Sequence, residues 1–303
     1  MLFRSHDGYI WGRGTLDDKG AVFAILEAVE YALSHHLQPT RDIYLAFGYD
    51  EEVGGMTGAQ SIAHHFTQLG LHFAFIQDEG LVIVEDMLPG ISGPIALVGM
   101  QEKGAVDVDV RMRQEGGHAS MPPPLSAVGK VAKLVHHLES HKLKPQVGQA
   151  LEDMFHFLCP EMTGLFRFLF CNLEVFKPVV TAVMSSKPAT EASIATTMAF
   201  TRTRAGEKRN VLPTLAEVSM NIRVGPHHSV QQVLDAIRAA AGEDVTAHTL
   251  YGDPIFELEA IQPLEPSPYS SPYTPEFHFI QKAVAQVFPG VPMAPSLSVA
   301  NTD

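Results

Sequence analysis

Residues 9–20 read YIWGRGTLDDKG and join a short apolar stretch, Tyr9–Trp11, to the start of a helical pattern. After this stretch, apolar side chains recur at spacings of three and four, at Val22, Ile25, Leu26, Val29 and Leu33. That spacing predicts an amphipathic helix. The chain therefore opens with a strand, a glycine-containing turn and a helix.

The same alternation of strands and helices continues to about residue 100. We expect further strands at Arg41–Tyr49, His72–Gln77 and Pro94–Met100, and a second helix at Thr57–Leu69. Alternation of this kind predicts an α/β domain with a mostly parallel sheet and helices on both faces.

The pattern changes after residue 100. The expected strands are Ala105–Met112, Ser193–Phe200, Glu217–Val224 and Val245–Leu250, and the expected helices are Leu125–Leu138 and Val230–Ala240. Few strands and two helices predict a two-layer α+β domain. We assign residues 1–100 and 251–303 to the first domain and residues 101–250 to the second, inserted domain.

Two other segments differ in composition from their surroundings. Gln146–Lys187 is rich in Phe, Leu, Val and Met. Helical packing within the second domain is the favoured interpretation, and a wall for an apolar ligand is the alternative. Asp253–Pro275 is rich in proline, and we interpret it as a surface connection back to the first domain.

Composition limits the classes of partner. The chain has 303 residues and a net charge of −13, which argues against a nucleic-acid partner because phosphate binding needs a basic surface. No apolar run reaches the roughly 18 residues of a membrane helix. The two cysteines, Cys159 and Cys171, form neither a disulfide framework nor a thiolate zinc site, so we expect free buried thiols.

Carboxylates follow three of the expected strands. Asp17 follows the first strand, Glu51 and Glu52 follow the second, and Asp78 and Glu79 follow the third. Each alone is typical of a helix cap or a solvated side chain. In an open α/β sheet, however, the carboxyl ends of the strands form the ligand-binding crevice. Carboxylates that converge there repel one another unless a cation lies between them, so the pattern indicates a metal site.

Several sequence blocks resemble the co-catalytic zinc metallopeptidases of family 20, which include aminoacylases, glutamate carboxypeptidases and carboxypeptidase S. The blocks extend over nearly the whole chain in the family's order. They are Tyr9–Gly20, Gly48–Gly55, Ile76–Gly80, Gly116–Pro122, Asn210–Pro213, Asn221–Arg223 and Asn301–Asp303. The Asp-Glu-Gly and Asn-Thr-Asp blocks are most similar to carboxypeptidase S and the N-fatty-acyl-amino-acid synthase/hydrolase type.

The resemblance implies a site with two zinc ions. It implies that Asp17 bridges the two ions, that Glu52 binds one of them and that Asp78 binds the other. It implies that Glu51 is the general base, which takes a proton from the attacking water. It also implies a cis peptide bond between Asp17 and Asp18.

The second domain resembles the family's lid, which also forms a homodimer. This implies that His118, in Gly-Gly-His-Ala-Ser, enters the partner's active site and stabilises the oxyanion. It implies that Asn210 and Arg223 hold the free carboxylate of a small-molecule or peptide substrate, because the planar guanidinium binds a carboxylate at two points. Without the resemblance, Arg223 is typical of an ion pair at a strand end.

The chain departs from the family pattern at two metal ligands. The family has a zinc-binding histidine in an upstream His-x-Asp motif and another near its C-terminus. Here His6 and Asp7 are adjacent, and the sequence stops at Asp303. We therefore expect an internal fragment of a longer enzyme, with an incomplete ligand set. The resemblance leaves a secreted and a vacuolar or lysosomal location open.

These patterns favour a zinc-dependent amidohydrolase or carboxypeptidase. The expected substrates are N-acyl amino acids or peptides with a free C-terminal carboxylate, and the reverse condensation of fatty acid and amino acid is included. The alternative is a non-catalytic dimerisation or binding module that lacks a complete zinc site. A metal-free α/β binding protein is the third interpretation, in which the carboxylate pattern is a coincidence.

Overall fold

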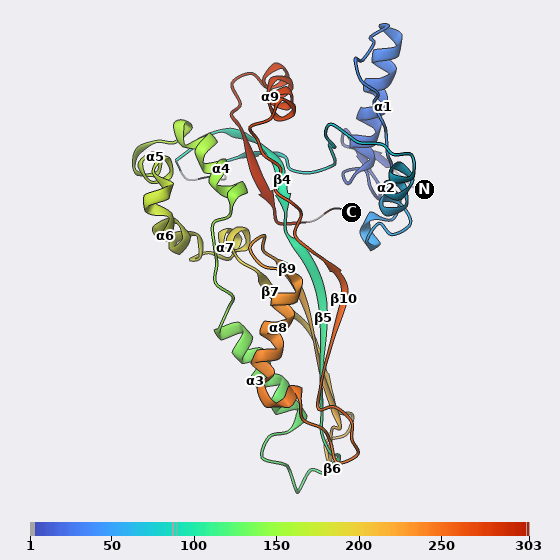
Figure 1. Cartoon of the computed structure of the whole chain (residues 1–303), viewed down its shortest axis with the longest axis vertical. Helices are drawn as coiled ribbons and strands as arrows, with labels where there is room; N and C mark the ends of the chain where they lie inside the picture. The colour runs from blue at the N-terminus through green and yellow to red at the C-terminus, as the bar shows by residue number, and fades with distance from the viewer. Residues whose placement is uncertain (1–3, 87, 89, 301, 303) are drawn as a thin grey trace. The chain divides into compact units, whose positions relative to one another are not determined.

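The computed structural model describes residues 4–86, 88, 90–300 and 302 (Figure 1). It contains two compact units, Met1–Glu79 with Thr302–Asp303, and Gly80–Asn301. This boundary lies before the expected one at residue 100. The difference arises because Ile95 packs in one core with residues far along the chain, such as Leu151 and Leu297.

The first unit contains a small hairpin and short helices. Its elements are β1 (Arg4–His6), β2 (Tyr9–Trp11), α1 (Lys19–Ser34), η1 (Glu51–Val53) and α2 (Ala59–Gln68). The two strands pair antiparallel. Both helices expected from the apolar spacing are therefore present.

Two segments that the sequence predicts as strands, Arg41–Tyr49 and His72–Gln77, lie outside the strands of this unit. Ring contacts connect them. The ring centroids of Tyr44 and Phe73 lie 5.4 Å apart, and Phe66 of α2 lies 5.2 Å from Phe73. The apolar content of these segments therefore forms an aromatic cluster and not a hydrogen-bonded ladder in the described residues.

A four-stranded antiparallel sheet dominates one part of the second unit, in the order β10-β5-β9-β7. The strands are β5 (Gly104–Arg113), β7 (Thr197–Ala205), β9 (Leu215–Val224) and β10 (Phe256–Leu264). Helices α3 (Ala127–Ser140) and α8 (Val230–Ala241) lie along the sheet (Figure 1). Their apolar sides share one core with the inward residues of β5 and β9, so the predicted two-layer arrangement is present.

A three-stranded sheet lies in the other part of this unit, in the order β11-β4-β3. Strand β11 (Met293–Ser298) is parallel to β4 (Pro94–Glu102), and β3 (Ile83–Glu85) is antiparallel to it. Five helices accompany it in sequence: α4 (Gln149–Leu158), α5 (Gly164–Cys171), α6 (Leu173–Met184), α7 (Pro188–Ile194) and α9 (Pro275–Val287). The helical interpretation of residues 146–187 is confirmed.

The predicted fold class, α/β with an added two-layer α+β domain, is confirmed, but in the second unit one expected strand was also misplaced. Val245–Leu250 does not form the last strand of the sheet, and β10 takes that place at Phe256–Leu264. Phe256, Leu258 and Ala260 alternate toward the core while the glutamates between them point outward. The many prolines around this segment indicated a surface connection, although its apolar residues alternate with the two-residue period that is typical of a strand.

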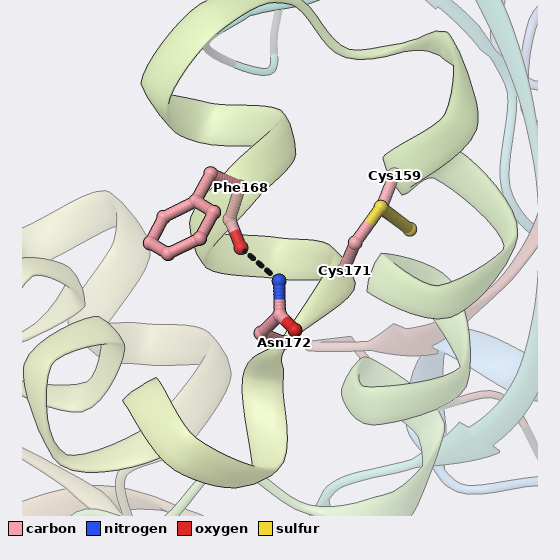
Figure 2. Close-up of a disulfide and its surroundings, with 4 residues drawn as sticks. All are labelled: Cys159, Phe168, Cys171 and Asn172. Carbon is pink, nitrogen blue, oxygen red and sulfur yellow. Dashed lines mark hydrogen bonds between the residues drawn. A yellow bond between two sulfur atoms is a disulfide. The ribbon is translucent and has the colours of Figure 1, made fainter.

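The expectation of two free thiols is wrong. Cys159 and Cys171 form a disulfide with a Cα–Cα distance of 5.3 Å (Figure 2). Helix α5 occupies most of the intervening chain and folds back, so its last residue meets the short helix η2 (Cys159–Glu161). Beside the disulfide, Asn172 Nδ2 donates to the Phe168 carbonyl at 2.8 Å. In the described part of the chain, no helix is long and apolar enough to cross a membrane.

Candidate functional site

The turn between β2 and α1 places Asp17 at an exposed position. Lys19 stabilises this turn, because its backbone N–H donates to the Gly14 carbonyl at 2.8 Å and its ammonium donates to the Arg13 carbonyl at 3.0 Å. The peptide bond between Asp17 and Asp18 is cis, as the resemblance implied.

Glu51 and Glu52 begin the one-turn helix η1. Asp50 precedes them and stabilises the loop, because its Oδ2 accepts from the Thr57 amide at 2.9 Å and from the Thr57 hydroxyl at 2.6 Å. These hydrogen bonds lower the pKa of Asp50. Gly58 must be small here, since a Cβ would lie 2.2 Å from Asp50 Oδ1. The loop thus fixes the backbone beside both glutamates.

Negative charge converges on Glu79. Partial burial and the charges of Asp17, Asp18 and Asp78 raise the pKa of Glu79, and a hydrogen bond from Thr302 opposes this shift. The Thr302 hydroxyl donates to Glu79 Oε1 at 3.1 Å, and the Glu79 amide donates to Asp78 Oδ1 at 2.8 Å. Asp17 and Asp78 therefore both lie within electrostatic range of Glu79. Asn301 and Asp303 of the same block lie outside the described residues.

The donor chemistry of these residues suits a hard or borderline cation, because carboxylate oxygens that repel one another are stabilised by positive charge. The coordination shell is nevertheless incomplete. Among residues 4–86, 88, 90–300 and 302, no three His, Cys, Asp or Glu side chains lie close enough to hold one metal ion. Glu52 thus does not form such a group with Asp17 and Asp78, and the ligand assignment stays a prediction.

In the second unit, His118 and Asn210 lie together. Strands β6 (Gly117–His118) and β8 (Val211–Leu212) pair antiparallel, with His118 opposite Val211. The Ala119 amide donates to the Asn210 carbonyl at 3.0 Å. The Gly-Gly-His-Ala-Ser and Asn-Val-Leu-Pro blocks, far apart in the sequence, therefore meet in one small ladder.

Ser120 determines which ring nitrogen of His118 carries the proton. Its backbone N–H donates to His118 Nδ1 at 3.2 Å, and its hydroxyl oxygen lies 2.8 Å from the same nitrogen. A nitrogen that accepts a backbone hydrogen bond is unprotonated, so we assign the neutral tautomer with hydrogen on Nε2. His118 is exposed, and its Nε2–H is therefore a donor directed away from Ser120.

Arg223 lies in β9, opposite Ala105 and Thr197 in the neighbouring strands. Lys103 lies beside it at the junction of β4 and β5. The Lys103 ammonium is buried and donates to the carbonyls of Ala192 and Ala195, at 3.0 and 2.8 Å. Burial and the charge of Arg223 lower the pKa of Lys103 to about 8.

Arg223 and the His118–Asn210 pair lie at opposite ends of the four-stranded sheet. Strand β9 runs from Leu215, next to β8, to Val224. At about 3.3 Å per residue, Arg223 lies roughly 26 Å along β9 from Leu215. Figure 1 shows β6 at the end of the sheet away from β4. Asn210 and Arg223 of one chain are therefore too far apart to hold the same carboxylate.

Three residues with clear structural roles at these positions were not identified from the sequence. Thr302 binds Glu79, Ser120 binds His118, and Gln114 connects the segment after β8 to the first residue of α3. Ser120 and Thr302 belong to blocks that the resemblance covers. Gln114 has no sequence signal, since its contacts join positions 13 and 99 residues away.

Comparison with known proteins identifies the class. The model of peptidase family M20/M25/M40 matches residues 2–303, and the chain belongs to this family. The resemblance to the family-20 metallopeptidases is thus confirmed.

Curated relatives include "Probable carboxypeptidase S-like 2" of Dictyostelium discoideum, which is 42% identical over 98% of this chain. "N-fatty-acyl-amino acid synthase/hydrolase PM20D1" of Xenopus tropicalis is 37% identical, also over 98% of this chain. The chain covers 56% of the length of each of these two relatives.

Solved structures support the fold. Aminopeptidase PepT from Bacillus cereus superposes with a TM-score of 0.56 at 15% identity, over 99% of this chain and 62% of that one. Human carnosine dipeptidase 1 gives a TM-score of 0.53 at 13% identity, over 98% of this chain and 64% of that one. At this identity the likeness concerns the fold alone.

Proposed function

We propose that this protein is a zinc-dependent amidohydrolase that cleaves N-acyl amino acids or the C-terminal residue of peptides. The observation that carries the proposal is the convergence of Asp17, Asp18 and Asp78 on Glu79 in a chain of this peptidase family. The names of the two relatives support the substrate class, and the synthase/hydrolase name supports the reverse condensation as a second direction.

Zinc ions held by Asp17, Glu52 and Asp78, with ligands beyond these, would supply a water of lowered pKa at neutral pH. The chain's own residues supply the proton transfers and charge stabilisation. Glu51 takes the proton of the attacking water and delivers it to the departing amide nitrogen. The Nε2–H of His118 donates to the carbonyl oxygen as negative charge develops there.

The distance between Arg223 and the His118–Asn210 pair supports a composite site. Both groups serve one substrate only if they come from different chains, with Arg223 of one copy beside His118 and Asn210 of another. Arg223 then holds the substrate carboxylate at two points, and the pair acts at the scissile amide. Two copies of this chain are therefore part of the proposal.

The edge strands of the four-stranded sheet, β7 and β10, favour β7 as the contact between copies. Both edge strands have an irregular register, but the opposite edge, β10, also contains Pro263, which disfavours pairing with another strand. Strand β7 contains no proline. Met198 and Phe200 of β7 line a 540 Å³ groove together with residues of α3 and α8. An edge strand without proline, beside a groove that its own side chains help to line, is suited to pairing with a second copy.

Complementation between inactive subunits tests the composite site. A His118→Ala subunit and a Glu51→Gln subunit of the complete protein are each expected to be nearly inactive. Mixed dimers contain one site with both groups intact, so part of the activity should return. Proven heterodimers without any recovery would contradict the trans role of His118.

One observation favours a second candidate function, a non-catalytic dimerisation or binding module. The part of the chain that the structure describes contains no complete group of metal ligands. Hydrolysis of an N-acyl amino acid, measured with and without zinc, separates the two candidates. Zinc-dependent turnover supports the hydrolase, and dimerisation without zinc binding or turnover supports the module.

A further inference from the structure

We propose that Gln114 is a positioning residue that holds the strands of His118 and Asn210 in register, and the catalytic part of this inference rests on the function proposed for His118. Gln114 follows β5 directly and lies three residues before β6. It is partly buried and belongs to neither strand.

The side-chain amide of Gln114 makes two hydrogen bonds in different directions. Its Nε2 donates to the Pro213 carbonyl at 2.7 Å, and its Oε1 accepts from the Ala127 amide at 2.7 Å. Its backbone N–H also donates to the Thr214 carbonyl at 3.0 Å. Gln114 therefore connects the segment after β8 to the first residue of α3.

The ladder that carries the two site residues needs such support. Strands β6 and β8 are two residues long, and a ladder this short is only marginally stable by itself. The residues that follow His118, from Ala119 to Leu125, are all exposed. Few buried contacts therefore remain to hold His118 opposite Val211 if the link to Pro213 is lost.

The approach of the two segments is close at the same point. A Cβ on Gly116 would lie 2.9 Å from Thr214 Cγ2, so a larger residue would require the Thr214 side chain to move. Gln114 and Gly116, which lie between β5 and β6, thus help to set the spacing between β6 and β8. A displacement of about 1 Å at a catalytic group lowers the rate by roughly a hundredfold, so the register matters for turnover.

Two substitutions separate positioning from helix capping. Gln114→Ala removes both side-chain hydrogen bonds. Gln114→Glu keeps an acceptor for the Ala127 amide, where negative charge is favourable at a helix N-terminus, but loses the donor to Pro213. Gln231→Ala is the matched control, because Gln231 is exposed on α8 and its amide donates to Asp235 within the same helix.

The test measures kcat and KM of the complete zinc-loaded protein with an N-acyl amino acid, the melting temperature, and hydrogen exchange at the Ala119 amide. We expect Gln114→Glu to melt near the wild-type temperature, to exchange faster at Ala119 and to lower kcat about tenfold or more at a similar KM. Gln231→Ala should match the wild type in all of these.

The outcomes distinguish the inference from the function on which it rests. Wild-type exchange at Ala119 and wild-type kcat in both Gln114 variants would overturn the positioning role. Faster exchange with full activity in both Gln114→Glu and His118→Ala would support the structural link and overturn the proposed role of His118. Faster exchange with reduced kcat in Gln114→Glu, and a larger loss in His118→Ala, would support both.

Discussion

Removal of the Cys159–Cys171 disulfide should lower the free energy of unfolding of the second unit by an amount that follows from the length of the loop that the disulfide closes. The two cysteines are 12 residues apart. For a loop of this length, the loss of chain entropy in the unfolded state corresponds to about 3 kcal/mol at 25 °C. The bridge also holds the end of α5, where Phe170 packs on Phe155 with ring centroids 4.4 Å apart. Loss of the bridge therefore acts on a buried contact as well.

Thermal unfolding with and without a reductant measures this effect. In a unit of more than 200 residues, 3 kcal/mol corresponds to a fall in Tm of roughly 6–12 °C. A double variant with Cys159→Ala and Cys171→Ala should melt at the lower temperature and should not respond to the reductant. Equal melting of the reduced and oxidised wild type would refute the reasoning, provided that thiol titration shows complete reduction.

The remaining predictions concern the acidic site, the pH dependence of stability and the zinc response of the chain. Glu51→Gln in the complete protein should keep zinc bound and lower turnover roughly a hundredfold or more. Glu52→Gln should instead weaken zinc binding. Metal analysis that finds equal zinc loss in both variants would contradict these roles. Burial and the positive charges of His228 and Lys103 lower the pKa of His227 to about 4. Between about pH 6.5 and pH 4 the native state therefore binds fewer protons than the unfolded state, so stability is lost as the pH falls through this range. In urea titrations, His227→Phe should flatten this acid slope, and a slope equal to that of the wild type would exclude His227 as its source. Added zinc should raise the melting temperature of this chain only slightly, because metal binding adds to folding free energy only where the ligands are complete, and the described residues contain no group of three such ligands. A clear zinc-dependent rise in a thermal melt would contradict this expectation.

Periodic apolar patterns made the second unit largely predictable. The spacing of Val230–Ala240 predicted a helix, and the structure has α8 at Val230–Ala241 with a capping box at Ser229. The alternation in Glu217–Val224 likewise predicted β9. Both elements place one apolar face in the same core, so local pattern and tertiary packing agree.

Features that depend on distant parts of the chain were not predictable in this way. The pairing of Cys159 with Cys171 depends on α5 folding back, which two cysteines alone do not indicate. The two hydrogen bonds of Gln114 depend on the register of three segments. The candidate catalytic and metal-binding residues were identified through motif resemblance, because single carboxylates and a single exposed histidine carry little information by themselves.

The central claim is that this protein hydrolyses an amide bond with the help of zinc and Glu51. The most direct measurement is the rate of N-acyl amino acid hydrolysis by the complete protein before chelation, after chelation and after zinc is restored. Our account predicts that chelation abolishes turnover, that zinc restores it, and that Glu51→Gln stays nearly inactive in all three conditions. Full turnover in the chelated protein, or wild-type turnover in Glu51→Gln, would contradict it.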